Sequence, residues 1–142
     1  MRITNYNHRQ DFERLLEIND ACYSGVYRPP RETVNDMILI SDVYVARNGL
    51  RIVGFAIVKN TCLPYIWNIA VDPLFQGNGV GGSLLREIIK RYTIAGDKEI
   101  HLDVNSTNPA QKLYFDYGFR VKSVCTKYFD PNDGLHMVRP LP

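Results

Sequence analysis

The chain has 142 residues, of which 45% are hydrophobic and 23% charged, and its formal net charge is +2. This length favours one globular domain, residues 1–142, and the small net charge without a dense Lys/Arg run gives no reason to expect a nucleic-acid partner. No apolar run is long enough to span a membrane, Met1–Asn5 lacks the apolar segment of a signal peptide, and the three cysteines are scattered. We therefore expect a cytoplasmic protein with no membrane partner, no disulfide framework and no metal site.

The first part of the chain predicts a short strand followed by two helices. Residues 2–6 are typical of a strand, and the apolar spacing in residues 11–22 predicts an amphipathic helix. The Tyr/Arg/Pro-containing segment 23–30 ends that helix. A second helix follows Pro30 and includes Val34, Met37 and Ile38.

The middle of the chain predicts a hairpin, a third strand and a helix. Residues 42–47 and 52–58 are apolar strands, and Asn48-Gly49 between them predicts a type I′ turn. Residues 65–71 form the next strand, which ends before Pro73 because proline lacks the N–H that a central strand needs. Helical spacing then predicts a helix over residues 80–95.

The last part of the chain predicts a strand, a short helix and a terminal hairpin. Residues 99–105 alternate, with Ile100, Leu102 and Val104 on one face and polar residues on the other. A short helix opens at Asn108-Pro109 and ends near Gly118, and strands over 120–129 and 135–139 follow, separated by a turn at 130–134. A helix must cross over between the strands at 65–71 and 99–105, so they form a parallel pair in a mixed, mostly antiparallel α/β sheet flanked by helices.

The segment between strand 65–71 and helix 80–95 contains four glycines at or near a helix start. Such a start offers unpaired N–H groups and a partial positive charge, and glycines let an anion approach the backbone closely. A tight strand-to-helix turn stabilised by packing alone is the structural alternative. The segment is neither a Walker A loop nor a dinucleotide fingerprint.

The run Gln76-Gly77-Asn78-Gly79-Val80-Gly81, after Asn-Ile-Ala-Val-Asp-Pro, resembles the acyl-CoA signature of the GCN5-related N-acetyltransferase (GNAT) family. The order of the predicted elements is similar to the GNAT fold across nearly the whole chain. The resemblance implies that acetyl-CoA is the co-substrate and that it binds along one continuous stretch of backbone and side chains. That stretch comprises Ile69, Ala70, Val71, Gln76, Gly77, Asn78, Gly79, Val80, Gly81 and Gly82.

A second segment, Asn108 to Phe119, resembles the family's N-x-x-A-x-x-L-Y-x-x-x-G-F pattern but is one residue shorter between Asn and Tyr. Tyr114 matches the tyrosine that the family places near the coenzyme sulfur as general acid. A phenol suits that task because it stays protonated at neutral pH. Asn108 is our choice for the cofactor-contacting asparagine, and Thr107 is the alternative by strict spacing.

The identity of the general base is left open by the residues. Asp103 matches a position where ribosomal-protein N-terminal acetyltransferases, the nearest group, carry a glutamate, and it would act directly or through a water. A purely structural role for Asp103 is the alternative, as is a reaction with no protein base. His101 is a weaker candidate for the base, and no other residues in the sequence support such a role for His136.

The implied activity is direct transfer of acetyl to a primary amine: a protein N-terminus, a lysine or a small amine. Residues 23–31, Tyr65 and Tyr128-Phe129 are expected to face that acceptor. The three cysteines predict no covalent acetyl-enzyme. The alternative function is a non-catalytic acyl-CoA-binding module of the same fold, and a homodimer is an expectation because dimers are common in the family.

Overall fold

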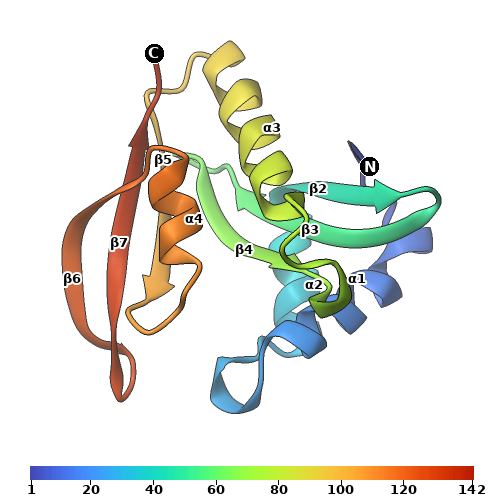
Figure 1. The fold of residues 1–142 in the computed structure, drawn as a ribbon, viewed down its shortest axis with the longest axis horizontal. Coiled ribbons are helices and arrows are strands. Elements are labelled where there is room, and N and C mark those ends of the chain that lie inside the picture. Colours follow the sequence, from blue (N-terminus) through green and yellow to red (C-terminus); the bar gives the residue numbers. More distant parts are fainter.

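The computed structural model describes residues 1–142 as helices on both faces of one seven-stranded sheet (Figure 1). The strand order is β1-β2-β3-β4-β5-β7-β6, and β4 and β5 are the one parallel pair. This confirms the predicted mixed sheet. The strands are β1 Arg2–Asn5, β2 Ser41–Asn48, β3 Arg51–Lys59, β4 Tyr65–Val71, β5 Glu99–Asn105, β6 Arg120–Phe129 and β7 Asn132–Pro140. The helices are α1 His8–Cys22, α2 Arg31–Leu39, α3 Val80–Ile94 and α4 Gln111–Asp116, with 3-10 turns η1 Gly25–Tyr27 and η2 Pro73–Phe75.

The two faces of the sheet carry separate hydrophobic cores. One core joins α3 and α4 to the sheet and contains the fully buried Leu84, Ile88 and Ile100. The other joins α1 and α2 to β2, β3 and β4 through residues such as Leu15 and Phe55. In Figure 1, α3 and α4 lie in front of the sheet, and α1 and α2 lie behind β3 and β4. No helix is long and apolar enough to cross a membrane.

The structure corrects two local predictions. The hairpin at β2 and β3 is present, but Asn48 pairs with Arg51, so the turn centres on Gly49-Leu50. Within this turn, Gly49 alone has a positive φ, which fits a type II′ turn rather than the predicted type I′ turn. The helix expected from Asn108 begins only at Gln111, because the side chains of Asn105 and Asn108 accept backbone N–H bonds that hold residues 105–110 in turns.

The parallel pair separates soon after it forms, and this creates the site. β4 and β5 pair only at Tyr65↔His101 and Ile66↔Leu102, although both strands continue for several residues. In β4 the register against β3 also shifts, so that Trp67 is an extra, bulged residue. The carboxyl ends of β4 and β5 therefore diverge. Ligands of α/β sheets commonly bind in a crevice of this kind, outside the carboxyl ends of parallel strands.

Candidate active site

The loop that leaves β4 is held by one buried carboxylate. Asp72 accepts a hydrogen bond from the backbone N–H of Leu74 at 3.0 Å and pairs with Arg14 of α1 at 2.5 Å. These contacts, the Leu74 N–H first, hold the pKa of Asp72 below its usual range. The carboxylate therefore fixes the direction in which the chain turns from β4 into η2 and the glycines.

The glycine segment presents its backbone to solvent as a row of free donors. Gly77 and Gly79 have φ of +82° and +80°, a conformation that other residues adopt only under strain. The six N–H groups of residues 77–82 donate to no other atom of the protein. Gln76 and Asn78 fold back instead, and donate to the carbonyls of Val71 and Phe75. The backbone, rather than the side chains, is what this segment offers to an anion.

The other two glycines are explained by packing against α4. A Cβ at Gly81 would lie 2.9 Å from Leu113 Cδ2, and one at Gly82 would overlap the Tyr117 hydroxyl. Packing, the structural alternative that the sequence allowed, therefore accounts for two of the four glycines. Gly77 and Gly79 serve the backbone conformation, and Gly81 and Gly82 let α3 approach α4.

The free N–H groups open into a cavity of about 620 Å³. It lies between the end of β4, the start of α3 and the segment before α4, and we call it the donor cavity. Of the residues that the sequence assigns to the cofactor, all but Asn78 line it. They are Ile69, Ala70, Val71, Gln76, Gly77, Gly79, Val80, Gly81, Gly82 and Asn108.

The backbone of β4 also has unpaired groups on the side of this cavity. The Asp72 N–H donates to Val53 of β3, so alternation along the strand turns the N–H and C=O groups of Ile69 and Val71 away from β3. The contacts agree, because the Tyr23 hydroxyl lies 3.3 Å from the Ile69 carbonyl and the Cys22 thiol donates to the Val71 carbonyl. The N–H groups of Ile69 and Val71 are therefore available to a ligand in the gap between β4 and β5.

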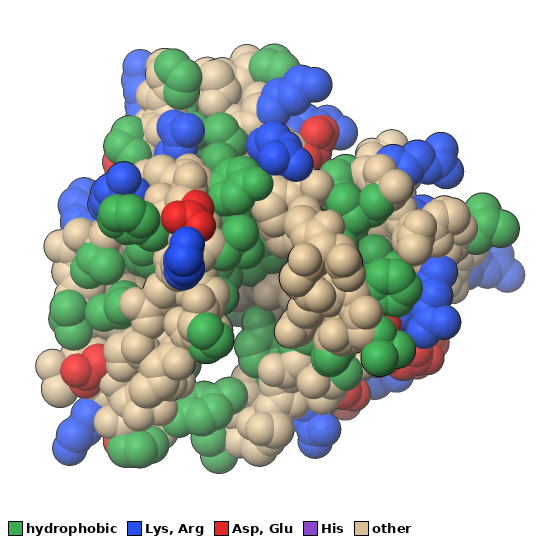
Figure 2. Space-filling model, viewed as in Figure 1, with side chains coloured by type: hydrophobic (Ala, Val, Ile, Leu, Met, Phe, Trp, Pro, Cys, Tyr) green, Lys and Arg blue, Asp and Glu red, His purple; other side chains and the backbone are tan.

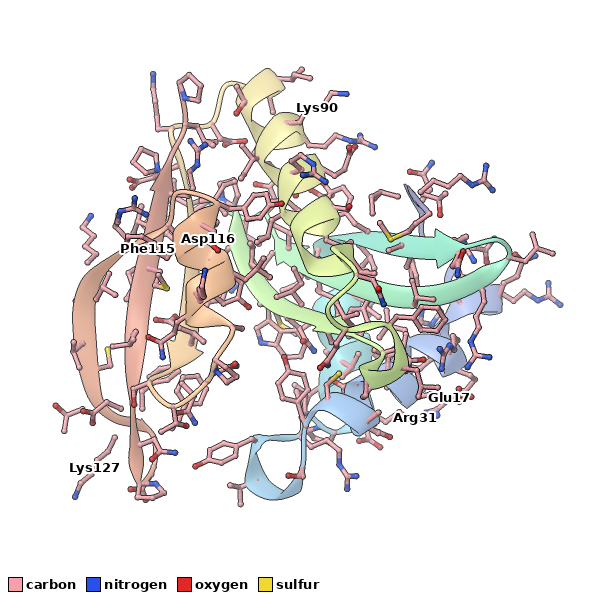
Figure 3. All side chains as sticks on the ribbon, in the orientation of Figure 1. Glu17, Arg31, Lys90, Phe115, Asp116 and Lys127 are labelled. Carbon is pink, nitrogen blue, oxygen red and sulfur yellow. The ribbon has the colours of Figure 1, made fainter.

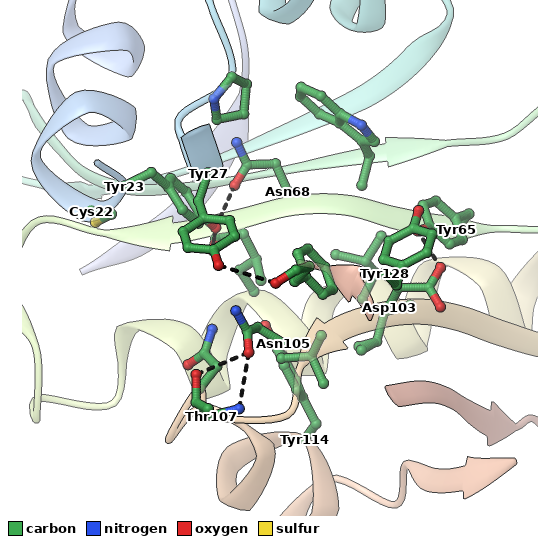
Figure 4. A pocket seen from close by; sticks show the side chains of 18 of the residues that line it. Cys22, Tyr23, Tyr27, Tyr65, Asn68, Asp103, Asn105, Thr107, Tyr114 and Tyr128 are labelled. Atoms are coloured by element: carbon green, nitrogen blue, oxygen red, sulfur yellow. Dashed lines mark hydrogen bonds between the residues drawn. The ribbon is translucent and has the colours of Figure 1, made fainter. Parts of the chain in front are cut away.

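A second cavity of about 460 Å³ adjoins the first. Its walls come from the segment around η1, from β4 and β5, and from the end of β6; we call it the acceptor cavity (Figure 4). The hollow near the lower centre of Figure 2 opens between the parts of the chain that carry α4 and η1. The predicted acceptor-facing residues Tyr23, Tyr27, Tyr65, Tyr128 and Phe129 all line it.

The two cavities share five residues: Cys22, Tyr23, Ile69, Asn108 and Tyr114. Thr107 lines only the acceptor cavity, which favours Asn108 over Thr107 as a donor-side residue. The Tyr114 side chain is buried, and this burial raises its pKa above the ordinary value, so the phenol stays protonated. Burial likewise raises the pKa of the Cys22 thiol, which disfavours a thiolate nucleophile.

Two contacts hold the segment around η1 over the acceptor cavity. Tyr23 donates to Asn68 Oδ1 at 2.9 Å, and Asn68 donates to Asn19 of α1 at 3.0 Å. At the far side, the Tyr27 hydroxyl reaches the carbonyls of Phe129 and Asp130 at 3.0 and 3.1 Å. The buried Asn19 and Asn68 were missed by sequence reasoning, although a polar residue at a buried position of a strand was a signal that could have found Asn68.

In Figure 3, Arg31 lies at the start of α2, where the segment around η1 ends, and Lys127 lies near the tip of the β6–β7 hairpin. Arg31 forms an ion pair with Glu13 of α1. Lys127 has a positive φ of 56°, and its N–H donates to Asp133 across the hairpin. Neither Arg31 nor Lys127 lines the acceptor cavity.

Asp103 lies in the acceptor cavity at the centre of a small polar cluster. Its Oδ2 accepts from the Tyr65 hydroxyl at 2.6 Å, and its Oδ1 is 2.9 Å from His136 Nδ1 (Figure 4 shows the first contact). Burial, and then Asp103, raise the pKa of Tyr65, which stays a donor. The expectation that His136 has no supporting partner residues is wrong, because the β5–β7 register places it directly across from Asp103.

A splayed parallel pair, a row of free N–H groups and two cavities that meet at a phenol form an arrangement suited to group transfer between two bound molecules. A family model described as an acetyltransferase (GNAT) domain matches residues 40–121. A [ribosomal protein bS18]-alanine N-acetyltransferase of Haemophilus ducreyi is 31% identical over 128 residues, which cover 88% of this chain and 87% of that protein. The chain belongs to the GNAT acetyltransferase family, which confirms the predicted family and enzyme class.

Further relatives agree with this assignment. The N-alpha-acetyltransferase RimI of Mycobacterium tuberculosis is 30% identical, over 85% of this chain and 80% of that protein. The crystal structure of the ribosomal-protein-S18-alanine N-acetyltransferase from Escherichia coli superposes with a TM-score of 0.88 at 24% identity, covering 99% of this chain and 93% of that one. A GNAT acetyltransferase from Elizabethkingia anophelis with acetyl-CoA bound superposes with a TM-score of 0.83 at 22% identity, over 99% and 97% of the two chains. These two structures share the fold.

Proposed function

We propose that this chain transfers acetyl from acetyl-CoA directly to the α-amine of a protein N-terminus, with Tyr114 as the general acid. All of the machinery would belong to one domain, residues 1–142. The observation that carries the proposal is the junction of the two cavities at Ile69 and Tyr114. A thioester that enters from one cavity and an amine that enters from the other would meet there.

The donor cavity supports acetyl-CoA as the acyl donor. The N–H groups of residues 77–82 suit a pyrophosphate, because they carry partial positive charge at the start of a long helix. The pantetheine arm would follow Ile69 and Val71, whose free N–H groups can bind it and polarise the thioester carbonyl. One such donor is typically worth about 3 kcal/mol in the transition state.

The acceptor cavity supports a singly charged amine. Asp103 is the one charged side chain among its 19 lining residues, so the cavity offers one negative charge and many aromatic rings. At pH 7 an α-amine needs only about 1 kcal/mol to lose its proton, whereas a lysine amine needs about 4.6 kcal/mol. An N-terminal α-amine therefore requires less of a base, and the names of the relatives point to the same kind of acceptor.

The chemistry needs three proton transfers besides the attack itself. Asp103, directly or through a water, accepts the proton of the ammonium, and the neutral nitrogen attacks the thioester carbon. The tetrahedral intermediate collapses as the C–S bond breaks, and Tyr114 gives its proton to the departing thiolate. The nitrogen loses its second proton, which restores the Tyr114 phenol.

The test is release of free thiol from acetyl-CoA over three acceptors. One is a peptide that begins with alanine, the second is the same peptide with a blocked N-terminus and an internal lysine, and the third is a polyamine. We expect release with the first alone and a mass increase of one acetyl group at its N-terminus. A protein that binds acetyl-CoA in calorimetry but releases no thiol with any acceptor would instead be a binding module.

A further inference from the structure

A row of polar side chains leads away from Asp103 along β5 and β7. Asp103 Oδ1 lies 2.9 Å from His136 Nδ1, and the other ring nitrogen of His136, Nε2, lies 2.9 Å from His101 Nδ1. The row ends where His101 Nε2 lies 3.0 Å from Glu99 Oε1. Each contact is within hydrogen-bond distance, so the row is continuous from the acceptor cavity to Glu99.

The sheet register places these side chains on one face. Residues 99, 101 and 103 alternate with the buried Ile100 and Leu102, and Asp103 pairs across the sheet with His136. This is the face that α1 and α2 cover only over β2, β3 and β4. In the order Asp103, His136, His101 and Glu99, the side chains are 16%, 25%, 13% and 33% exposed. Four residues of strand span about 13 Å, so the row extends from the acceptor cavity to the more exposed Glu99.

The number of protons in the row follows from its partners. It contains three successive contacts, and each joins two atoms that can both hold a lone pair: oxygen to nitrogen, nitrogen to nitrogen, and nitrogen to oxygen. Each contact needs one proton. All three are satisfied together only when the row holds three protons, and with two protons one contact brings lone pairs together. The row therefore has a loaded and an unloaded state that differ by a single proton.

Other titratable groups surround the Asp103 end of the row. Tyr65 of β4 donates to Asp103 Oδ2, and Tyr128 of β6 lies against Tyr65. Lys59 of β3 pairs in register with Tyr65. On β7, the groups next to His136 in the sheet are Ser123 and Asp103, of which only Asp103 is charged. Each imidazole has two ring nitrogens, one of which can accept a proton while the other donates one, so two imidazoles in contact can form a proton path.

We propose that Asp103, His136, His101 and Glu99 form a proton relay that carries the proton of the acceptor amine from the cavity to solvent. The relay rests on the proposed function and adds His136, His101 and Glu99 as residues that act through Asp103. In the unloaded state both rings carry hydrogen on Nε2. The ammonium N–H bond breaks, its proton passes through Asp103 to His136 Nδ1, and the row is loaded.

The row returns to its unloaded state by releasing a proton to water, so no other reactant is needed. The His101 Nε2–H bond breaks, and its proton leaves to water beside Glu99 while the proton between the rings moves to His101 Nδ1. One proton has entered and one has left, which matches the single net proton released when an ammonium and a thioester give an amide and a thiol. Exchange with water returns the two remaining ring protons to Nε2 before the next turnover.

The decisive variant is His101→Gln, because glutamine can still hydrogen bond to its neighbours but cannot pass a proton on. We expect kcat at pH 7 in dilute buffer to fall about tenfold, less than the roughly 10²–10⁴-fold effect of a general base. Added imidazole should restore the rate, and acetyl-CoA affinity and melting temperature should stay those of the wild type. The matched control is His8→Gln, which removes an exposed histidine bonded only to Tyr6 and should leave kcat unchanged.

Two outcomes overturn the relay: full activity of His101→Gln in dilute buffer, or a loss that imidazole does not restore. If the wild type releases no thiol with any acceptor, the proposed function itself has failed. NMR of histidine-labelled protein tests the proton count without activity. A hydrogen-bonded N–H proton shared by the two rings, absent in His136→Gln, is expected, and rings that show no such proton at any pH from 5 to 8 contradict the relay.

Discussion

The donor and acceptor cavities lie side by side but are built in different ways. The donor cavity offers mainly backbone groups from one continuous segment, residues 69–82. The acceptor cavity offers side chains from η1, β4, β5 and β6, held together by bonds such as that from Tyr27 to Phe129. Backbone groups are the same whatever the residue, so they suit a donor that never changes. Side chains can be exchanged one at a time, so they suit an acceptor that differs between related enzymes.

The largest expected effect is at the junction of the two cavities. Tyr114→Phe removes the proposed general acid and keeps the ring, so kcat should fall about 10²-fold or more. Acetyl-CoA affinity, measured by calorimetry, should not change. Tyr117→Phe is the matched control, because Tyr117 lies on the same helix region and lines neither cavity. An unchanged kcat in Tyr114→Phe would remove the acid from the mechanism.

A pair of glycine substitutions tests whether the two sides are independent. Gly79 and Gly25 both have positive φ, and a Cβ at either would meet nothing within 4 Å, so alanine adds only backbone strain. That strain is worth roughly 1–2 kcal/mol, or about tenfold. Gly79→Ala should weaken acetyl-CoA binding, and Gly25→Ala should raise the acceptor KM. If each variant changes both constants equally, the two cavities are coupled and the comparison fails.

A smaller effect is expected where the acceptor cavity is closed by Tyr27. Tyr27→Phe keeps the ring beside Phe129 but removes the hydroxyl bonded to the two carbonyls. The acceptor KM should rise about two- to threefold, because an exposed hydrogen bond contributes less than about 1 kcal/mol. Steady-state kinetics with the alanine peptide measures this. A change in acetyl-CoA affinity instead would place Tyr27 on the donor side.

The smallest expected effect is in the pH profile, where the rate should reach a plateau at high pH. The general acid must be protonated, and burial raises the pKa of Tyr114, so its protonated form persists to higher pH than that of a free tyrosine. The rate should rise as the acceptor α-amine loses its proton, near pH 7.7–8.0, and then stay level to about pH 10. A fall in kcat of the wild type between pH 8 and 9 would argue against a buried phenol as the acid.

Much of the fold could be predicted from the sequence because proline positions and hydrophobic alternation mark the ends of its strands clearly. β4 and β5 have the predicted bounds, since Pro73 ends the first and alternation defines the second. The β2–β3 turn was assigned to the wrong type, because Asn48-Gly49 suggests one turn and the pairing of Asn48 with Arg51 imposes another. A dipeptide signal cannot decide a register that depends on the packing of two whole strands.

The candidate site also has one part that the sequence could indicate and another part that it could not. The residues proposed to bind the donor, apart from Asn108, lie in one short stretch of the chain, so a local pattern was enough to single them out. The pairing of Asp103 with His136 joins residues 33 apart in the chain, and it depends on β7 lying between β5 and β6. The bond from Asn68 to Asn19 depends on how α1 crosses β4. Neither contact leaves a spacing in the sequence that could be recognised.

The sequence by itself determined the element order, the parallel pair and the glycine segment, because these follow from local periodicity, proline positions and backbone freedom. Only the tertiary structure decided that β4 and β5 part after Ile66, that two cavities meet at Tyr114, and that Asp103 continues through His136 and His101 to Glu99. The physical reason is distance along the chain. Backbone conformation is set by neighbouring residues, whereas a cavity and a hydrogen-bonded row exist only after distant strands have paired in register.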